Sequence, residues 1–368
     1  MKIAIIGAGI GGLTAAIALR RAGHEVAVHE AAPVLGDVGA GITITPNAWK
    51  GLASLGLGDV LAAAGDEVPQ QAIRAHDTGA PILDIARGAT TRSTYGAPYA
   101  MFHRADLHRL LVEAVGADKI VLNAPVEDAA TLDADAVIAA DGLKSVVRST
   151  VFGNPPARFT GHVAWRGLVP ADRLRPEAAA FGSVVWAGPG RVFVRYPVRH
   201  GALINLVGLT RTDQWRGEGW SNRVGMAEWL NEYAGWHDDV TSGIAATTDD
   251  SRMAWGLFAR DPLPTWISGR IALLGDAAHP MLPFMGQGAA MAIEDAVMIG
   301  RAFAVSGNVT EAFARYEAAR KPRTDFIQHQ SLLGADRLQF EVAKTGLPPA
   351  ETEDSLGIFH YDPATAEI

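Results

Sequence analysis

A glycine-rich turn at the start of the chain is the feature that most constrains its fold. Residues 2–6 form a β-like run, Gly7, Gly9 and Gly12 follow with the spacing Gly-x-Gly-x-x-Gly, and residues 13–22 have helical spacing. A second β-like run covers residues 25–29. The pattern predicts a β-α-β unit that begins at residue 1. There Gly7 permits the tight turn, Gly9 lets the backbone approach a pyrophosphate, and Gly12 allows close helix–strand packing.

An acidic residue at the end of the second run strengthens this interpretation. The helix N-terminus offers unpaired N–H groups and a partial positive charge to phosphates. Glu30 lies 18 residues after Gly12, where its carboxylate can accept hydrogen bonds from ribose hydroxyls. We therefore predict a dinucleotide site. A glycine-rich turn without a ligand is the alternative, and it leaves Glu30 unexplained.

The same stretch can also be interpreted as a membrane or signal segment. Residues 3–19 are an apolar run of 17 residues, followed by Arg20 and Arg21. The glycine turn inside the run suits a buried strand and helix better. We therefore expect no membrane span.

Two further motifs follow predicted strands or precede predicted helices. Arg104 stands just before a helical run over residues 106–115 and could hold a phosphate; the alternative is a solvated arginine with Asp106 as helix cap. Asp141 and Gly142 follow a strand over residues 135–140, an arrangement found at cofactor edges of α/β folds. A plain strand-to-helix turn would give the same pattern.

A last motif combines a strand end with a helix start. Asp276 follows a strand over residues 270–274 and can bind a polyol hydroxyl. A helix begins near residue 288, and its N–H groups can stabilise the anionic ring edge of a reduced flavin. The residues at this helix start are Gly286, Gln287, Gly288 and Ala289. Glu294 and Asp295, in the same helix, are interpreted as solvated or capping residues.

Composition excludes several classes of protein. The chain has 368 residues, a net charge of −8, no basic cluster and no cysteine. Nucleic acid is therefore not an expected partner, and disulfides, Fe–S clusters and thiolate metal sites are excluded. We expect no metal and a cytoplasmic location. Short β-rich runs between residues 160 and 210 predict an antiparallel sheet that interrupts the α/β unit.

Taken in order, these motifs resemble the class A flavoprotein monooxygenases, or aromatic hydroxylases. The resemblance covers nearly the whole chain. Within this family, the sequence resembles salicylate hydroxylases and 6-hydroxynicotinate 3-monooxygenases in Gly39-Ala-Gly-Ile and in residues 164–167. It implies an α/β fold of the p-hydroxybenzoate hydroxylase type, with a Rossmann-like FAD-binding domain interrupted by an antiparallel substrate sheet. The expected FAD-binding parts are residues 1–70, 100–155 and 268–368, and the expected substrate parts are residues 71–99 and 156–267.

The resemblance also implies roles for single residues. Glu30 and Arg104 would contact the ribose and phosphate side of non-covalently bound FAD, and Asp276 the ribityl and pyrophosphate region. Asp141 and Gly142 would serve FAD and a transiently bound NADH or NADPH. The residues expected at the isoalloxazine and substrate are His279, Pro280 and the stretch Gly286–Ala289.

The expected function is hydroxylation of a small aromatic acid by O2 through a flavin C4a-hydroperoxide, in a monomer or homodimer. The acid would be of the hydroxybenzoate or hydroxypyridine-carboxylate type. Two rivals stay open: an FAD-dependent dehydrogenase or reductase without oxygen insertion, and a non-catalytic flavin redox sensor.

One strand carries two competing substrate residues. Residues 192–198 alternate, so Arg195 and Tyr196 point to opposite faces. Arg195, where relatives often have histidine, could grip a carboxylate, whereas Tyr196 could orient a phenol hydroxyl. Arg166 and His162 are the next candidates for the carboxylate.

Overall fold

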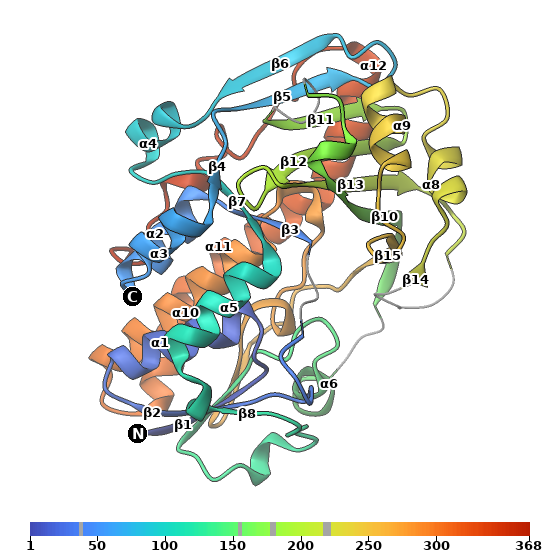
Figure 1. Ribbon diagram of the computed structural model, residues 1–368. Coiled ribbons are helices and arrows are strands. Elements are labelled where there is room, and N and C mark those ends of the chain that lie inside the picture. The colour runs from blue at the N-terminus through green and yellow to red at the C-terminus, as the bar shows by residue number, and fades with distance from the viewer. Residues whose placement is uncertain (37–39, 154–156, 177–181, 216–221) are drawn as a thin grey trace.

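A six-stranded sheet forms the base of the molecule in the computed structural model, which describes residues 1–36, 40–153, 157–176, 182–215 and 222–368 (Figure 1). Its strand order is β16-β17-β9-β1-β2-β8, and every pairing except β16–β17 is parallel. The strands are β1 (Lys2–Ile6), β2 (Glu25–His29), β8 (Ile120–Val121), β9 (Ala136–Ala139), β16 (Ile267–Ser268) and β17 (Ile271–Leu273).

Parallel pairing brings the sequence motifs to one edge of this sheet. The glycine turn follows β1, Glu30 follows β2, Asp141 follows β9, and Asp276 follows β17. The carboxyl edge of a parallel sheet is where α/β folds bind their ligands.

An eight-stranded sheet of mostly antiparallel pairs forms the second layer, in the order β14-β15-β10-β13-β12-β11-β5-β6. Only β11 and β5 pair in parallel. Its strands are β5 (Gln70–Ala75), β6 (Pro81–Ala86), β10 (Arg158–Pro170), β11 (Ser183–Gly188), β12 (Arg191–Val198), β13 (Leu203–Arg211), β14 (Asn222–Arg223) and β15 (Met253–Ala259). The expected domain boundaries stay a prediction.

A small three-stranded sheet lies between the two larger ones, with β7 (Ala100–His103) at its centre, and the helices pack around all three sheets. Its outer strands are β3 (Gly41–Ile44) and β4 (Asp66–Glu67). The helices are α1 (Ile10–Arg21), α2 (Pro46–Ser54), α3 (Gly58–Ala64), α4 (Ala89–Tyr95), α5 (Arg104–Val115), α6 (Val146–Val151), α8 (Met226–Glu232), α9 (Asp238–Ala245), α10 (Gly288–Val305), α11 (Val309–Asp336) and α12 (Ala343–Thr345).

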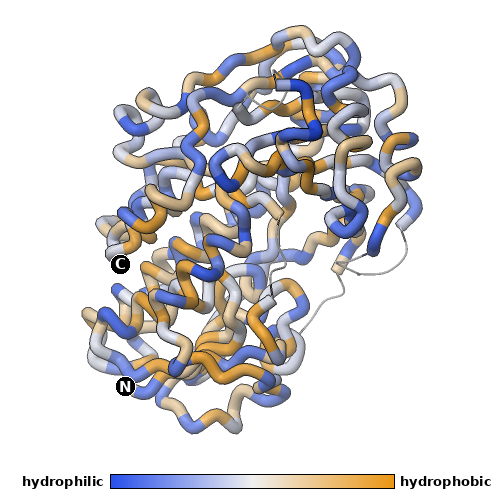
Figure 2. The backbone as a smooth tube through the Cα atoms, in the orientation of Figure 1, coloured by the Kyte–Doolittle hydropathy of each residue, from blue (hydrophilic) through white to orange (hydrophobic). Residues whose placement is uncertain are grey.

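The largest apolar core joins the six-stranded sheet to α1 and α10. Ile3 and Ile5 of β1 are 1% and 0% exposed, and Figure 2 shows hydrophobic residues concentrated along these strands. Residues 3–19, the apolar run, form β1 and most of α1. Within the part of the chain that the structure describes, no helix is both long and apolar enough to span a membrane.

The eight-stranded sheet has two differently covered faces. Trp229 of α8, Tyr233 just after it and Ile244 of α9 pack with strand residues on the outer face. The inner face meets Leu282 and Phe284, which follow the Asp276 motif. Substrate-facing residues are therefore expected on the inner face.

Helix α11 extends further than its sequence indicates. The sequence pattern predicts a helix over residues 310–320, yet α11 continues past Pro322 to Asp336. The expectation of a short helix is wrong because the later turns bury side chains such as Ile327 and Ser331, and this packing outweighs the loss of one backbone donor at Pro322.

Candidate active site

The first glycine turn has the close packing that its spacing predicts. A Cβ atom on Gly12 would lie 2.1 Å from the carbonyl oxygen of Gly7, and one on Gly7 would lie 2.5 Å from that of Ala140. Gly7 also has a φ of +99°. A Cβ atom on Gly9, by contrast, would meet nothing within 4 Å. The turn therefore leaves open space at the position where a pyrophosphate would approach the backbone.

Glu30 lies beside this turn. Its Oε2 accepts a hydrogen bond from the N–H of Ala8 at 2.7 Å, and its Oε1 accepts one from Ala32 at 2.9 Å. The carboxylate is thus oriented at the sheet edge, with lone pairs left for ribose hydroxyls.

Asp276 and Arg104 come together although 172 positions separate them in the printed sequence. Arg104 begins α5, and the two side chains are close enough that each influences the pKa of the other. Burial raises the pKa of Asp276, while His279 and Arg104 oppose that shift. A Cβ atom on Gly288 would lie 4.0 Å from Oδ1 of Asp276. The strand end and the helix start of the last motif are therefore neighbours in space.

Asp141 does both things that its sequence context allows. Its Oδ2 accepts hydrogen bonds from the N–H groups of Val146 at 2.9 Å and Val147 at 3.3 Å, at the start of α6. Its Oδ1 is buried and has no partner among the residues described. Gly142, with a φ of +77°, makes the turn. One oxygen therefore orders the turn while the other is left for a ligand.

The start of α10 offers backbone groups rather than side chains. Gly286 has a φ of +62°, and the helix begins at Gly288, followed by Ala289. The Gln287 side chain is fully buried and accepts a hydrogen bond from Asn47 Nδ2 at 3.1 Å. The available groups for an anionic ring edge are thus the N–H groups of the helix start.

The inner face of the eight-stranded sheet presents Tyr196, Arg166 and Asn205. Burial raises the pKa of Tyr196 to about 12, and the nearby Arg166 opposes this shift. Arg166 also influences Arg104 electrostatically, which places it at the junction with the FAD motifs. Asn205 Oδ1 accepts from Gly41 N–H at 2.7 Å, and its Nδ2 is buried without a partner in the described structure.

Arg195 lies on the other face. It is 2% exposed, and its Cζ is 5.2 Å from the ring centroid of Trp186, which belongs to the core covered by α8 and α9. Strand alternation places Arg195 and Tyr196 on opposite faces of the sheet, and the carboxylate-clamp role of Arg195 stays a prediction. His162 is on the inner face, and its Nε2 lies 3.1 Å from Oε1 of the buried Gln339.

The catalytic role expected of His279 stays a prediction, and its side chain is buried in the structure. It is 1% exposed, packs against Trp266, and its Nε2 lies 2.5 Å from Asp295 Oδ2. The ring is therefore turned into the core. Pro280, the next residue, has its carbonyl bound by Gln328 Nε2 at 2.7 Å.

Glu294 and Asp295 are not solvated, contrary to expectation. Both side chains are 0% exposed, and Arg320 of α11 forms ion pairs with them at 2.7 and 2.8 Å. Sequence reasoning also gave no role to Arg148, whose guanidinium donates to the carbonyls of Ala277 and Ala278. In the sequence, these ion pairs are indicated only by acidic residues in α10 and arginines in α11. Such residues occur in buried as well as in exposed pairs.

These residues fit FAD. The open space at Gly9, the unpartnered oxygen of Asp141 and the carboxylate of Asp276 beside Arg104 all lie along one sheet edge. The set combines groups for phosphate, ribose and an anionic ring, as a flavin dinucleotide requires.

Comparison with known proteins gives the same result. Residues 1–331 match the family model described as FAD binding domain. The chain is 37% identical over 352 residues to 3-hydroxybenzoate 6-hydroxylase 1 of Aquipseudomonas alcaligenes, covering 91% of this chain and 89% of the relative. It is 36% identical over 349 residues to 6-hydroxynicotinate 3-monooxygenase of Bordetella bronchiseptica, covering 90% of each.

Solved structures confirm the predicted fold class. Klebsiella pneumoniae HpxO complexed with FAD and uric acid has a TM-score of 0.87 at 29% identity, covering 98% of this chain and 95% of that one. A salicylate hydroxylase substrate complex has a TM-score of 0.81 at 25% identity, covering 99% and 96%. The chain belongs to the family of FAD-dependent aromatic monooxygenases.

Proposed function

We propose that this enzyme hydroxylates a small phenolic or hydroxypyridine acid and that Arg166 binds the carboxylate of that acid. The two relatives compared above are named for hydroxybenzoate and hydroxynicotinate, which are both carboxylic acids. This supports oxygen insertion over the dehydrogenase and sensor alternatives. FAD, when bound, supplies the redox chemistry with NAD(P)H and O2.

The observation that carries the proposal is the environment of Arg166. Its Nε is buried and has no hydrogen-bond partner within the described ranges. Its Cζ lies 5.4 Å from the ring centroid of Trp255. Burial lowers the pKa of the guanidinium, but an arginine still stays charged. A half-buried cation that lacks an anion is unfavourable, so a carboxylate ligand would compensate for the lost hydration.

Tyr196 would then orient the hydroxyl of the ring. Its pKa of about 12 keeps it protonated near neutral pH, so its O–H can donate to the phenol oxygen. Arg166 and Tyr196 share the inner face and influence each other, which suits a ring held at both ends. The apolar side chains of Trp255 and Phe284 on this side would exclude water.

The experiment compares Arg166→Met and Arg166→Lys with wild type. The assay measures NAD(P)H consumption with hydroxybenzoates and hydroxypyridine acids, and with the corresponding amides. Loss of a charge-assisted bond of about 1.5–3 kcal/mol should raise KM for acids by tenfold or more in Arg166→Met, with partial recovery in Arg166→Lys. Amides should be poor substrates of wild type, and their KM should change little in the Arg166 variants.

FAD retention separates the two roles that a cation at this junction can have. If Arg166→Met lost FAD but kept the KM of the acid, Arg166 would serve the cofactor and the substrate assignment would be wrong. Equal turnover of acid and amide by wild type would also contradict it.

A further inference from the structure

A single carboxylate holds both ends of the turn that carries Asp276. Oδ2 of Asp295 accepts the backbone N–H of Gly275 at 3.1 Å and lies 2.5 Å from Nε2 of His279. Oδ1 accepts from Nε of Arg320 at 2.8 Å. Asp295 is 0% exposed, so all these contacts are made away from water.

The turn itself has little freedom once its ends are fixed. Gly275 has a φ of +63°, and its carbonyl accepts the N–H of His279 at 2.9 Å. Asp276 is thereby presented beside Gly288 at the start of α10. Asp295 is the only hydrogen-bond partner of the His279 side chain among the residues that the structure covers, since Nδ1 has none.

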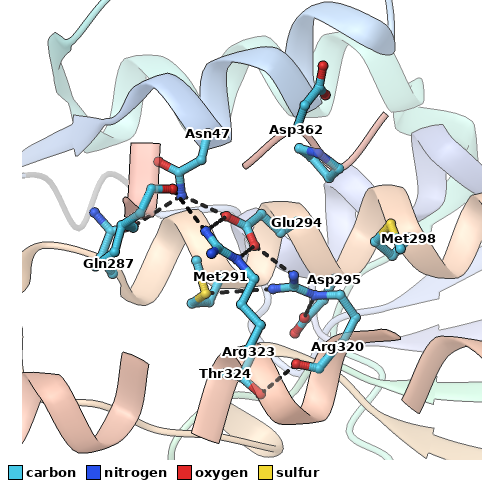
Figure 3. Close-up of polar contacts among 12 residues, drawn as sticks. Asn47, Gln287, Met291, Glu294, Asp295, Met298, Arg320, Arg323, Thr324 and Asp362 are labelled. Carbon is cyan, nitrogen blue, oxygen red and sulfur yellow. Dashed lines mark hydrogen bonds and ion pairs between the residues drawn. The ribbon is translucent and has the colours of Figure 1, made fainter. Parts of the chain in front are cut away.

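The Asp295 carboxylate is in turn part of a network that reaches the helix start (Figure 3). Arg320 pairs with Glu294 at 2.7 Å, and Arg323 donates to both oxygens of Glu294 at 2.8 and 2.9 Å. Asn47 Nδ2 donates to Glu294 Oε1 at 2.7 Å and to Gln287 Oε1 at 3.1 Å. The same buried charges therefore support Asp276 from one side and the start of α10 from the other.

The carboxylates of this network stay charged because cations lie beside them. Burial opposes ionisation of Asp295, but His279 and Arg320 outweigh it, so the pKa of Asp295 is lowered. The same holds for Glu294 beside Arg320 and Arg323. Two carboxylates thus stay ionised in the core, where hydrogen bonds to them are strong.

We propose that Asp295, acting through His279, is a positioning residue for FAD. The hydrogen bond between Asp295 and His279, called the latch below, fixes the distance between Asp276 and the start of α10. FAD would contact both of these groups. The inference rests on FAD binding by the family and not on the proposed substrate. It predicts that loss of the latch raises the Kd of FAD by more than the accompanying fall in melting temperature can explain.

The test uses His279 rather than Asp295, because removing a buried carboxylate leaves Arg320 without its partner. His279→Leu removes the donor, whereas His279→Gln keeps an N–H near the position of Nε2. Trp266→Phe is the matched control, since it changes the packing against His279 without removing the latch. Asp276→Asn is the reference for a directly weakened FAD contact.

Two quantities are measured on each holoenzyme: the Kd of FAD, from the fluorescence of FAD released on dilution, and the melting temperature at saturating FAD. We expect His279→Leu to raise Kd by about tenfold or more, as for loss of a hydrogen bond to a charged group. His279→Gln should recover most of this loss. Trp266→Phe should lower the melting temperature and leave Kd within about twofold of wild type.

Two results would overturn the proposal. One is a wild-type Kd in His279→Leu. The other is a Kd that simply follows the melting temperature across all variants, which would make the network a stabiliser of the fold alone. If His279→Leu does not fold, His279→Gln serves instead: a Kd as high as that of Asp276→Asn, at the melting temperature of Trp266→Phe, would contradict the proposal because the retained N–H should keep Kd near wild type.

Discussion

Gly41→Ala tests whether the position of Tyr196 controls turnover. A Cβ atom on Gly41 would lie 2.3 Å from Cε2 and 2.6 Å from the hydroxyl oxygen of Tyr196, and 2.7 Å from Cγ of Asn205. Asn205 cannot move freely, since it accepts the Gly41 N–H at 2.7 Å. The buried Tyr196 ring must therefore shift on the inner face of the sheet.

Forcing a methyl group into a packed site costs about 1–3 kcal/mol. If this strain displaces the hydroxyl that orients the substrate, kcat/KM for the aromatic acid should fall by about 5- to 150-fold. FAD content should not change, because Gly41 is absent from the FAD motifs. The assay is acid-stimulated NAD(P)H oxidation, with FAD content measured by visible absorbance.

Gly225→Ala is the matched control. A Cβ atom on Gly225 meets nothing within 4 Å, and its φ of −73° suits alanine. This variant should have wild-type kinetics. The reasoning would be refuted if Gly41→Ala kept kcat/KM within about twofold of wild type while it folded and bound FAD.

Three further predictions concern other parts of the molecule. Gly12→Ala should lose most of its FAD, measured by absorbance after purification, because its Cβ atom would lie 2.1 Å from the Gly7 carbonyl oxygen; wild-type FAD content would contradict this. Glu294→Gln should lower the free energy of unfolding by about 3–5 kcal/mol in denaturant titrations, and the partly exposed Glu311→Gln should lower it much less. Because the folded-state pKa of Glu294 lies below its ordinary value of 4.5, the stability it contributes is present above that pH and is lost on acidification, so Glu294→Gln should show a shallower decline below it. Arg195→Met should leave KM and kcat for the acid unchanged. A rise in KM of tenfold or more, about 1.4 kcal/mol, would instead support a role of Arg195 in binding the carboxylate.

The cofactor edge could be predicted because its signals are local. Each motif consists of a strand end followed by glycine or a carboxylate within a few residues, as at Gly7 and Asp276. Parallel strand pairing then gathers the motifs without further information. Arg104 needed the family resemblance, since a helix-starting arginine is usually solvated.

The substrate side could be predicted only in part. Alternation in β12 correctly separates Arg195 from Tyr196, but it does not say which face α8 and α9 cover. That depends on helices more than 25 residues further along the chain, as the element order shows. Alternation also does not say how far Arg195 is buried, and the structure buries it against Trp186.

The buried ion network was missed for a related reason. Asp295 and Arg320 are on different helices, and helical spacing alone assigns no partner to either. The helical pattern over residues 310–320 also stops short of the buried later turns of α11. Tertiary packing, not local propensity, decides both points.

Turnover under labelled oxygen gives the direct test of oxygen insertion into an aromatic acid. The purified holoenzyme would turn over with NAD(P)H and its best acid substrate under oxygen-18 gas, followed by mass spectrometry of the product and measurement of hydrogen peroxide. A monooxygenase should form a hydroxylated acid that carries one oxygen-18 atom, in proportion to the NAD(P)H consumed. Stoichiometric hydrogen peroxide with no labelled product from any acid that stimulates NAD(P)H oxidation would contradict it.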